Sequence, residues 1–174
     1  RGSLLTLAAI IALALAPVGA QVPAGPFPLA EDVASIDGIL KATYESVSGP
    51  RGQPRPWERD AALFIPGATV TAMWTDDSGR LRVNTNTLEE YQQNADWSSV
   101  GFFEEEIRRE VQQYGSMAHV WSSYAYRLTP DGPVRGRGIN SFQLIHDGSR
   151  WWIRGLMFYG EGPEAPLPEI YDVP

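Results

Sequence analysis

The acid–base side chains of this 174-residue sequence are most concentrated at positions 104–110, which read EEEIRRE. On a β-strand, Glu105 and Arg109 lie on the same side but about 13 Å apart at the usual rise, so they cannot pair directly. Each needs another protein partner, a water or a ligand. In a dry pocket the pKa of Glu105 rises, and its carboxyl group could act as a general acid or base while Arg109 orients or polarises a substrate oxygen. Both are therefore candidate catalytic residues.

The inward orientation of these two residues depends on the hairpin turn that follows them. If Tyr114-Gly115 forms the turn, Glu105 and Arg109 share a strand side with apolar neighbours, which places that side against the core. A one-residue shift of the turn would exchange the two sides. The alternative to catalysis is structural: Glu105 lies in water at the rim of the fold, and Arg109 binds a backbone carbonyl or a carboxylate such as Asp96.

Other polar and aromatic residues fall on helix or strand sides that we expect to face the interior. The chain has no cysteine, and its two histidines, His119 and His146, lie far apart in the sequence. Neither thiolate chemistry nor a metal centre is therefore expected, and no cofactor is predicted. The candidate lining of a ligand pocket is Tyr44, Trp74, Tyr124, Asn140, Phe142 and Trp151.

Helical periodicity is confined to the first half of the chain, and strand periodicity dominates the second half. Apolar residues recur at three and four positions over 31–47, a shorter helix is expected over 57–64, and Thr87 with Glu90 forms a capping box that opens a third helix. Alternation predicts short strands at 68–75 and 80–83 and long strands at 101–113, 116–128, 137–146 and 150–160. The fold class is therefore α+β, with three helices and a sheet dominated by four long strands.

The last hairpin, around Asp147-Gly148, is apolar on both sides, so neither side is expected to face only water. With those two residues as the turn, Leu144 faces Trp151 and Phe142 faces Ile153 on the core side. The opposite side holds Ile139, Gln143, Ile145, Trp152 and Leu156. The doubled tryptophan then supplies one ring to the core and the other to the outer face of the sheet.

Three segments resemble the nuclear transport factor 2-like superfamily, in particular its SnoaL-like members. They are WERDAALFIPGATVTAMW at 57–74, GSMAHVWSSYAYR at 115–127 and RGINSFQLIHDGSRWWI at 137–153, and the resemblance covers about 31–160. It implies a cone-shaped roll, in which a strongly bent antiparallel sheet wraps around three N-terminal helices. The same resemblance implies a pocket at the wide end of the cone.

The resemblance also implies dimerisation and a range of possible activities. Members of the superfamily often dimerise through the outer face of the sheet, which here implies a homodimer through Trp121, Ile139, Gln143, Ile145, Trp152 and Leu156. Its enzymes, such as ketosteroid isomerases, polyketide cyclases, scytalone dehydratases and epoxide hydrolases, use a pocket carboxylate or His with Tyr, Asp or Arg helpers. Tyr44 could stand where an isomerase has its oxyanion-hole Tyr, but no pocket Asp occupies the matching base position.

Both ends of the sequence differ in composition from the middle. Positions 1–20 carry a basic start, an apolar run and a small-residue site before Gln21, which is the layout of a Sec signal peptide. We therefore expect a secreted or periplasmic protein with no membrane attachment after cleavage; a retained membrane helix is the alternative, although the apolar run is short for one. Residues 21–30 are expected to form an extended leader. The Pro-rich tail, 161–174, is expected to strap onto the body or to dock a partner.

The net charge of −7 argues against a nucleic-acid partner, because such proteins need a basic surface to displace counterions. We expect an exported, dimeric domain that binds a small, apolar or cyclic molecule in its cone pocket. Two alternatives stay open. One is an isomerase, dehydratase or cyclase that uses Glu105 as general acid or base, and the other is a structural dimer whose cone is filled with side chains.

Overall fold

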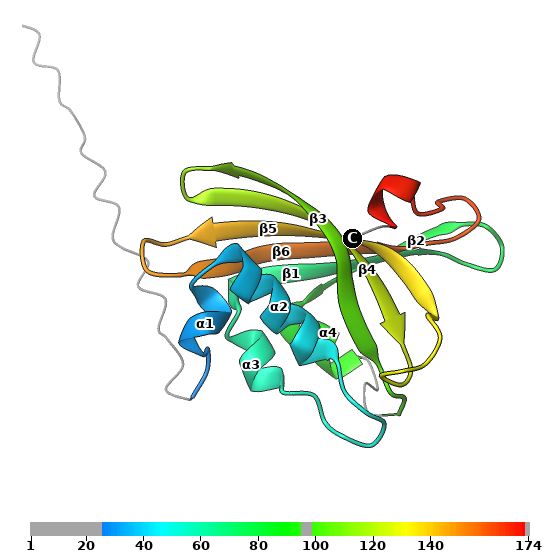
Figure 1. Ribbon diagram of the computed structural model, residues 1–174, viewed down its shortest axis with the longest axis horizontal. Helices are drawn as coiled ribbons and strands as arrows, with labels where there is room; N and C mark the ends of the chain where they lie inside the picture. Colours follow the sequence, from blue (N-terminus) through cyan, green and yellow to red (C-terminus); the bar gives the residue numbers. More distant parts are fainter. Residues whose placement is uncertain (1–25, 95–98, 173–174) are drawn as a thin grey trace, which may run out of the picture.

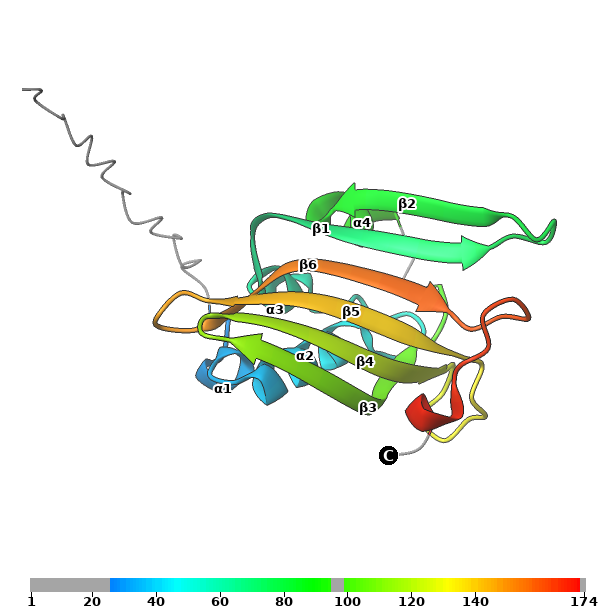
Figure 2. The same ribbon diagram turned by 90° about the horizontal axis from the view of Figure 1, so that it is seen from above.

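A single six-stranded sheet dominates the computed structural model, which describes residues 26–94 and 99–172. The strands run in the spatial order β2-β1-β6-β5-β4-β3, and the sheet curls so that β3 and β4 bend around the helices (Figures 1 and 2). Their bounds are β1 Phe64–Thr75, β2 Leu81–Thr87, β3 Phe103–Tyr114, β4 Met117–Arg127, β5 Gly136–His146 and β6 Trp151–Gly160. The α+β class and the cone-shaped roll are confirmed.

One strand pair departs from the expected antiparallel sheet. β1 and β6 run parallel, with Val70 next to Leu156, whereas the other neighbouring strands are antiparallel. The backbone N–H of Ile153 donates to the carbonyl of Leu63 at 2.9 Å and starts this pairing early in the chain. The segment after the second predicted helix therefore becomes strand from Phe64 onward, before Pro66-Gly67 rather than after it.

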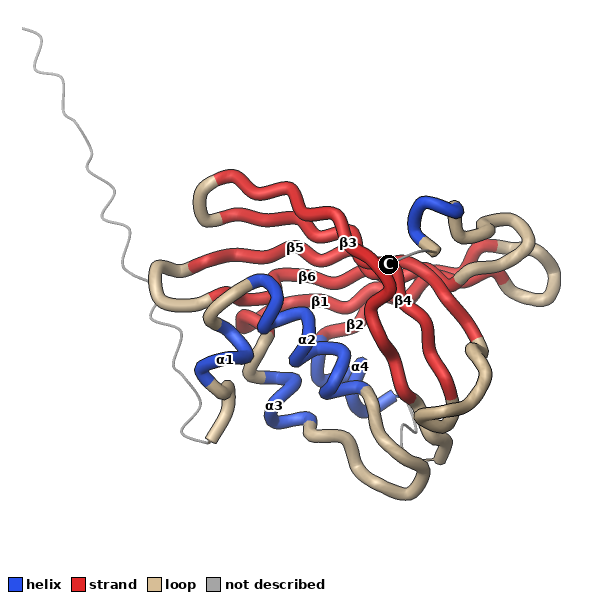
Figure 3. Tube along the Cα trace, viewed as in Figure 1, coloured by secondary structure: helices blue, strands red, loops and turns tan. Residues whose placement is uncertain are grey.

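The α-helices lie together on one face of the sheet, where Figure 3 labels them α1 to α4. The single helix expected over 31–47 is divided into α1 (Ala30–Val33) and α2 (Ile36–Val47), because the Ser35 side chain accepts from the N–H of Gly38 at 3.0 Å and caps a new helix. The shorter helix α3 (Trp57–Ala61) and α4 (Leu88–Asn94) follow.

The third predicted helix begins as the sequence indicates. The N–H of Thr87 donates to the Glu90 carboxylate at 2.8 Å, and the N–H of Glu90 donates back to the Thr87 hydroxyl at 3.2 Å. This reciprocal pair is the capping box. Ala95, which the sequence adds to the apolar side of this helix, lies outside the described residues.

The hydrophobic core fills the space between α2, α3 and the concave face of the sheet. Its fully buried members come from both layers, so neither layer can bury its apolar side without the other. The largest of them are Phe142, Ile39, Leu40, Leu63, Leu144 and Ile153.

A β-bulge in β3 decides which charged side chains face this interior. The register of the β3–β4 pair shifts at Ile107, which has no partner of its own. Because an extra residue reverses the alternation of sides along the bulged strand, the inner side holds Arg109 after the bulge but Glu104 and Glu106 before it. The prediction that Glu105 points inward is therefore wrong.

A second bulge lies in β6 at Arg154. On one side of it Leu144 pairs with Ile153, and on the other side Phe142 pairs with Leu156. Leu156 consequently joins the buried core, where it is 7% exposed. The prediction that Leu156 lies on the outer face of the sheet is therefore wrong. As with Glu105, a bulge reverses the sides along the strand.

The turn between β5 and β6 is also longer than the two residues expected. His146 pairs with Trp151, so four residues, 147–150, form the turn. The Asp147 carboxylate accepts the backbone N–H groups of Ser149 and Arg150 at 2.8 and 2.9 Å and holds this wider loop. The difference in register is two residues, so it leaves the two sides of the hairpin unchanged up to the bulge.

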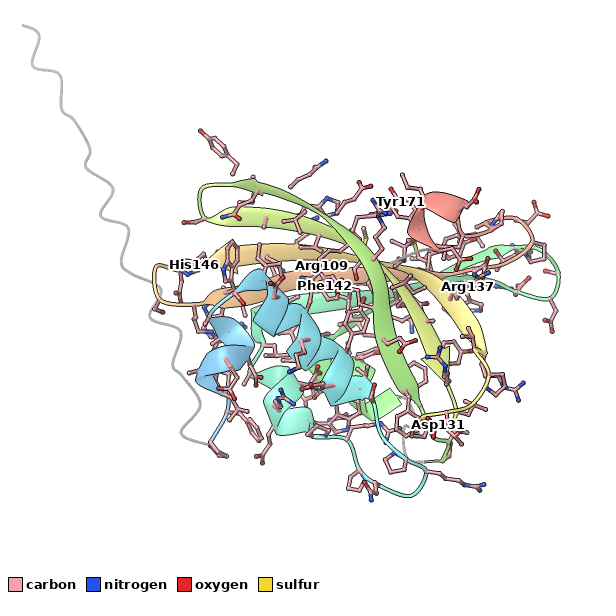
Figure 4. All side chains as sticks on the ribbon, in the orientation of Figure 1. Arg109, Asp131, Arg137, Phe142, His146 and Tyr171 are labelled. Carbon is pink, nitrogen blue, oxygen red and sulfur yellow. The ribbon has the colours of Figure 1, made fainter. Side chains whose placement is uncertain are left out.

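The C-terminal segment folds back along the convex face of the sheet, opposite the helices. The Ser123 hydroxyl donates to the carbonyl of Tyr171 at 2.7 Å, and Arg137 pairs with Glu161 at 2.9 Å and with Asp172. Figure 4 shows Tyr171, on the short helix η1 (Glu169–Tyr171), beyond the sheet from the helices. None of the described helices is long and apolar enough to span a membrane.

Candidate functional site

A cavity of about 250 Å³ lies inside the cone, between α2 and the concave side of β4, β5 and β6. Aromatic rings supply most of its wall, with one carboxyl and one amide group among them. Its lining is Thr43, Tyr44, Val47, Tyr91, Phe102, Glu104, Tyr124, Tyr126, Asn140, Phe142, Leu156 and Phe158. A volume of this size means that the side chains of residues 26–94 and 99–172 do not fill the cone, contrary to the hypothesis of a structural dimer with a filled cone.

Glu104 is the charged group of this cavity, and its environment favours the neutral acid. Burial raises the pKa of Glu104 from its usual 4.5 to about 7, because the ionised carboxylate loses its hydration. The hydrogen bond from the Asn140 amide, 3.1 Å from Oε1, opposes this effect and lowers the pKa, but by less. The Glu104 carboxyl is therefore poised to gain or lose a proton near neutral pH.

A chain of hydrogen bonds connects the cavity to a charged cluster at the surface. Arg109 binds the Glu106 carboxylate at 2.7 Å and Asp37 at 2.8 Å. The Ser122 hydroxyl donates to Glu106 at 2.6 Å and lies 2.7 Å from the Tyr44 hydroxyl. Since Ser122 has one proton and gives it to Glu106, Tyr44 must donate to Ser122.

The donors and acceptors of the two remaining hydrogen bonds, which involve Asn140, are fixed in the same way. The Asn140 amide nitrogen lies 3.1 Å from the Tyr44 hydroxyl oxygen and 3.1 Å from Glu104 Oε1. Both of its N–H groups are thus used by oxygen acceptors. Tyr44 has no proton left for a ligand, so it does not act as an oxyanion-hole donor in this arrangement; it orients Asn140, which in turn holds Glu104.

Solved structures resemble this architecture although their sequences differ widely. A protein of unknown function with a cystatin-like fold from Nostoc punctiforme PCC 73102 aligns with a TM-score of 0.56 at 14% identity, over 76% of this chain and 92% of its own. The hexachlorocyclohexane dehydrochlorinase LinA-type3 from Novosphingobium barchaimii LL02 aligns with a TM-score of 0.56 at 14% identity, over 81% and 93% of the two chains.

A third similar structure is provisionally assigned as a scytalone dehydratase, from Novosphingobium aromaticivorans DSM 12444. It aligns with a TM-score of 0.53 at 14% identity, over 74% of this chain and 83% of its own. The chain has the nuclear transport factor 2-like fold. No family model and no curated protein matches the sequence. At these identities the nuclear transport factor 2-like likeness extends to the fold alone.

The two residues proposed for catalysis occupy different places from those expected. Glu105 is exposed on the convex side of β3, where it pairs with Arg127. Arg109 is on the concave side, but its partners are Glu106 and Asp37, and it lies outside the cavity lining. Asp96, the carboxylate suggested as its partner, lies outside the described residues.

The residues proposed for the pocket are divided by the structure. Tyr44, Tyr124, Asn140 and Phe142 line the cavity. Trp151 is buried in the adjacent core, where it packs edge-on against His146 at 5.1 Å. Trp74 shares the concave side of β1 with Val70 but lies beyond the region that the helices cover, and it is 46% exposed.

Sequence reasoning missed Glu104, although its residue type and its place beside Glu105 were in view. The only available signal was indirect. Residues 104–110 contain six charged side chains and one apolar side chain. A regular strand with this sequence would direct several charges toward the core. A bulge at Ile107 is one solution to this conflict, but the pattern does not specify which residue bulges.

The residues proposed for a dimer interface also differ in their surroundings. Trp121, Ile139, Gln143 and Ile145 lie on the convex side of β4 and β5. Trp152 is on that side as well, but it is only 3% exposed. The Arg150 guanidinium stacks 3.6 Å above its ring, and its indole N–H donates to Asp147 at 2.7 Å. The chain itself covers Trp152.

Proposed function

We propose that this protein binds a small, largely apolar molecule in the aromatic cavity, with Glu104 as the polar anchor of the ligand. A single carboxyl group in a wall of aromatic side chains is the observation that carries this proposal. Ligand sites commonly combine an apolar lining with one or two placed polar groups. The Asn140 amide fixes the orientation of the carboxyl group, so the anchor is preorganised.

A second candidate function is acid–base catalysis through Glu104, of the isomerase, dehydratase or cyclase type. The pKa of about 7 favours it, because a general acid or base works best when its pKa is near the working pH. In this role the carboxylate removes a proton from carbon or oxygen of the substrate and returns it elsewhere. Similarly folded proteins named as a dehydrochlorinase and a dehydratase are compatible with such chemistry. Glu105 is not a candidate, since it faces away from the cavity.

Native mass spectrometry of protein purified from its source tests the binding proposal directly. We expect a bound small molecule in the wild type, and a weaker or absent adduct in Glu104→Gln. The matched control is Glu105→Gln, which removes the same charge one residue away on the convex side. An adduct that Glu104→Gln retains in full would contradict the anchoring role. Should turnover of a released ligand be found, unchanged turnover in Glu104→Gln would eliminate the acid–base mechanism.

We propose further that the convex sheet face pairs with a second copy to form a homodimer. Apolar residues cross this face from β2 to β4, and several are strongly exposed, which is uncommon on a monomer. They include Leu81, Val83, Trp121 and Met157. We expect Met157→Glu to produce a soluble monomer by light scattering. A dimer that persists in this variant would show that another surface is used.

We also propose export through the segment 1–20, which lies outside the described residues. The basic start, the apolar run and the small-residue site support this proposal. Expression of the full sequence in a bacterium, followed by mass measurement of the extracellular and periplasmic protein, tests it. A mature chain that begins at Gln21 is expected, and an intact chain in the membrane fraction would contradict export with cleavage.

A further inference from the structure

The cavity wall is an aromatic enclosure with fixed geometry. Phe102 and Tyr126 stack at a centroid distance of 4.9 Å and 27°, and Tyr91 meets Phe158 edge-on at 6.3 Å. Tyr44 meets Phe142 edge-on at 6.5 Å on another side. Mutual packing holds the rings, so they present faces and edges to a ligand without first having to be ordered.

The charge that the described cavity lining can carry near neutral pH is negative, and it comes from Glu104 when this residue is ionised. None of the described residues that line the cavity is Lys, Arg or His, and Glu104 is their only ionisable carboxyl group. The pKa values of Tyr44, Tyr91 and Tyr124 are all raised, mainly by burial and in addition by the charge of Glu104. The Glu104 carboxyl group and these three rings line the same cavity. Any ligand in the cavity meets this charge.

The arginine nearest to this site along the hydrogen-bond chain does not neutralise Glu104. Arg109 lies outside the cavity lining and is bound by Glu106 and Asp37. Charge compensation for an ionised Glu104 has to come from another source, and a bound ligand can supply it.

We propose that the cavity selects a small organic cation, an amine that is protonated or quaternary, over a neutral molecule of the same shape. This inference rests on the binding function proposed above and specifies the class of ligand. Aromatic faces attract cations through the ring quadrupole, and the attraction is stronger where water is excluded. The Glu104 carboxylate provides the opposite charge at close range. An anion would face both the carboxylate and the electron-rich ring faces, and none of the described lining residues is a cation that would balance them.

A groove beside the cavity fits this selectivity. It runs between α2 and β3, and Glu104 and Tyr44 belong to its lining as well as to that of the cavity. Glu105 and Arg127 pair with each other at this groove, so their charges offset. Acidic side chains outnumber basic ones among the rest, with Asp37, Glu45, Glu104 and Glu106 against Lys41 and Arg109. Together with the net charge of −7, this favours the approach of cations.

Choline and dimethylbutanol are the appropriate pair of probes. They share a hydroxyethyl group and a tetrahedral cluster of methyl groups, but one carries a quaternary nitrogen where the other has a quaternary carbon. Both are freely soluble, so their affinities can be compared by NMR titration up to millimolar concentrations. The proteins are the wild type, Glu104→Gln and the matched control Glu105→Gln.

We expect choline to bind the wild type at least about tenfold more tightly than dimethylbutanol. The preference should survive in Glu105→Gln and disappear in Glu104→Gln, with shifts of the Tyr124 and Tyr126 ring signals reporting the site. Equal or tighter binding of dimethylbutanol would overturn the cation inference but leave ligand binding in the cavity intact. A preference that Glu104→Gln retains would overturn the role of the carboxylate. Failure of both probes to shift the cavity signals would count against the cation inference and the binding function together.

Discussion

Replacing Glu104 by Gln should remove a pH-dependent loss of stability that the wild type shows near neutral pH. In the folded protein, burial raises the pKa of Glu104 from 4.5 to about 7. Between these values the folded chain binds more protons than the unfolded chain, so the free energy of unfolding falls as pH rises. Protonated Glu104 thus contributes to the free energy of unfolding at low pH. This contribution is lost as the pH increases through the pKa that Glu104 has in the folded protein.

The size of this effect follows from the two pKa values. A difference of about 2.5 pKa units corresponds to about 3 kcal/mol over the whole range, of which about 1.4 kcal/mol is lost between about pH 6 and pH 8. Asp60, which is buried and accepts a hydrogen bond from Gln92 at 2.7 Å, also has a raised pKa, at about 6. Most of the stability that protonated Asp60 contributes is lost below about pH 6. The change in the free energy of unfolding between about pH 6 and pH 8 therefore reports mainly on Glu104.

Equilibrium urea unfolding at about pH 6 and about pH 8 measures the difference. We expect the wild type and Glu105→Gln to be less stable at the higher pH by about 1 kcal/mol or more, whereas Glu104→Gln should lose only a few tenths. Gln keeps the shape of Glu and can still accept from Asn140, so the variant should fold. If Glu104→Gln and the wild type have the same pH slope, the reasoning about Glu104 burial is refuted.

Two further substitutions test the packing and the hydrogen bonds around the cavity. Tyr44→Phe removes the donor to the Ser122 oxygen and the acceptor of one Asn140 N–H, although Ser122 keeps its bond to Glu106 and Asn140 keeps its bond to Glu104. The free energy of unfolding should drop by about 1–3 kcal/mol, and an unchanged urea midpoint would show that the chain of hydrogen bonds contributes nothing. Phe142→Ala removes a fully buried ring that packs against Tyr44 and should cost about 3–5 kcal/mol by the same measurement, and a loss below about 1 kcal/mol would contradict its place in the core.

Local signals in the sequence predicted most of the fold. The capping box at Thr87 and Glu90 predicts the start of α4, and alternating runs predict the four long strands in order. The division of the first helix at Ser35 was missed because the apolar spacing continues across it. Only the capping bond to Gly38 separates the two helices, and serine is common in helices as well as at their N-termini.

Side assignments along the strands could be predicted only up to each bulge. The prediction that Arg109 lies on the inner side is confirmed, although the β3–β4 register differs from the expected one by two residues, since a difference of two preserves the sides. Beyond Ile107 the same reasoning fails by one residue and exchanges Glu105 with its neighbours. Leu156 fails in the same way beyond Arg154. A bulge depends on how two distant strands fit together, which local alternation does not record.

The bulge at Ile107 also gives the two inward carboxylates different chemistry. Glu106 binds Arg109 and accepts from Ser122, whereas none of the described residues that line the cavity around Glu104 is a Lys, Arg or His. Because Tyr44 donates to Ser122, its oxygen accepts from Asn140, and Asn140 presents N–H groups, not its carbonyl oxygen, to Glu104. A protonated Glu104 cannot donate to an N–H group. Its proton is therefore not used by Asn140, and it is available to a neutral ligand that accepts it or is released when a bound cation favours the carboxylate.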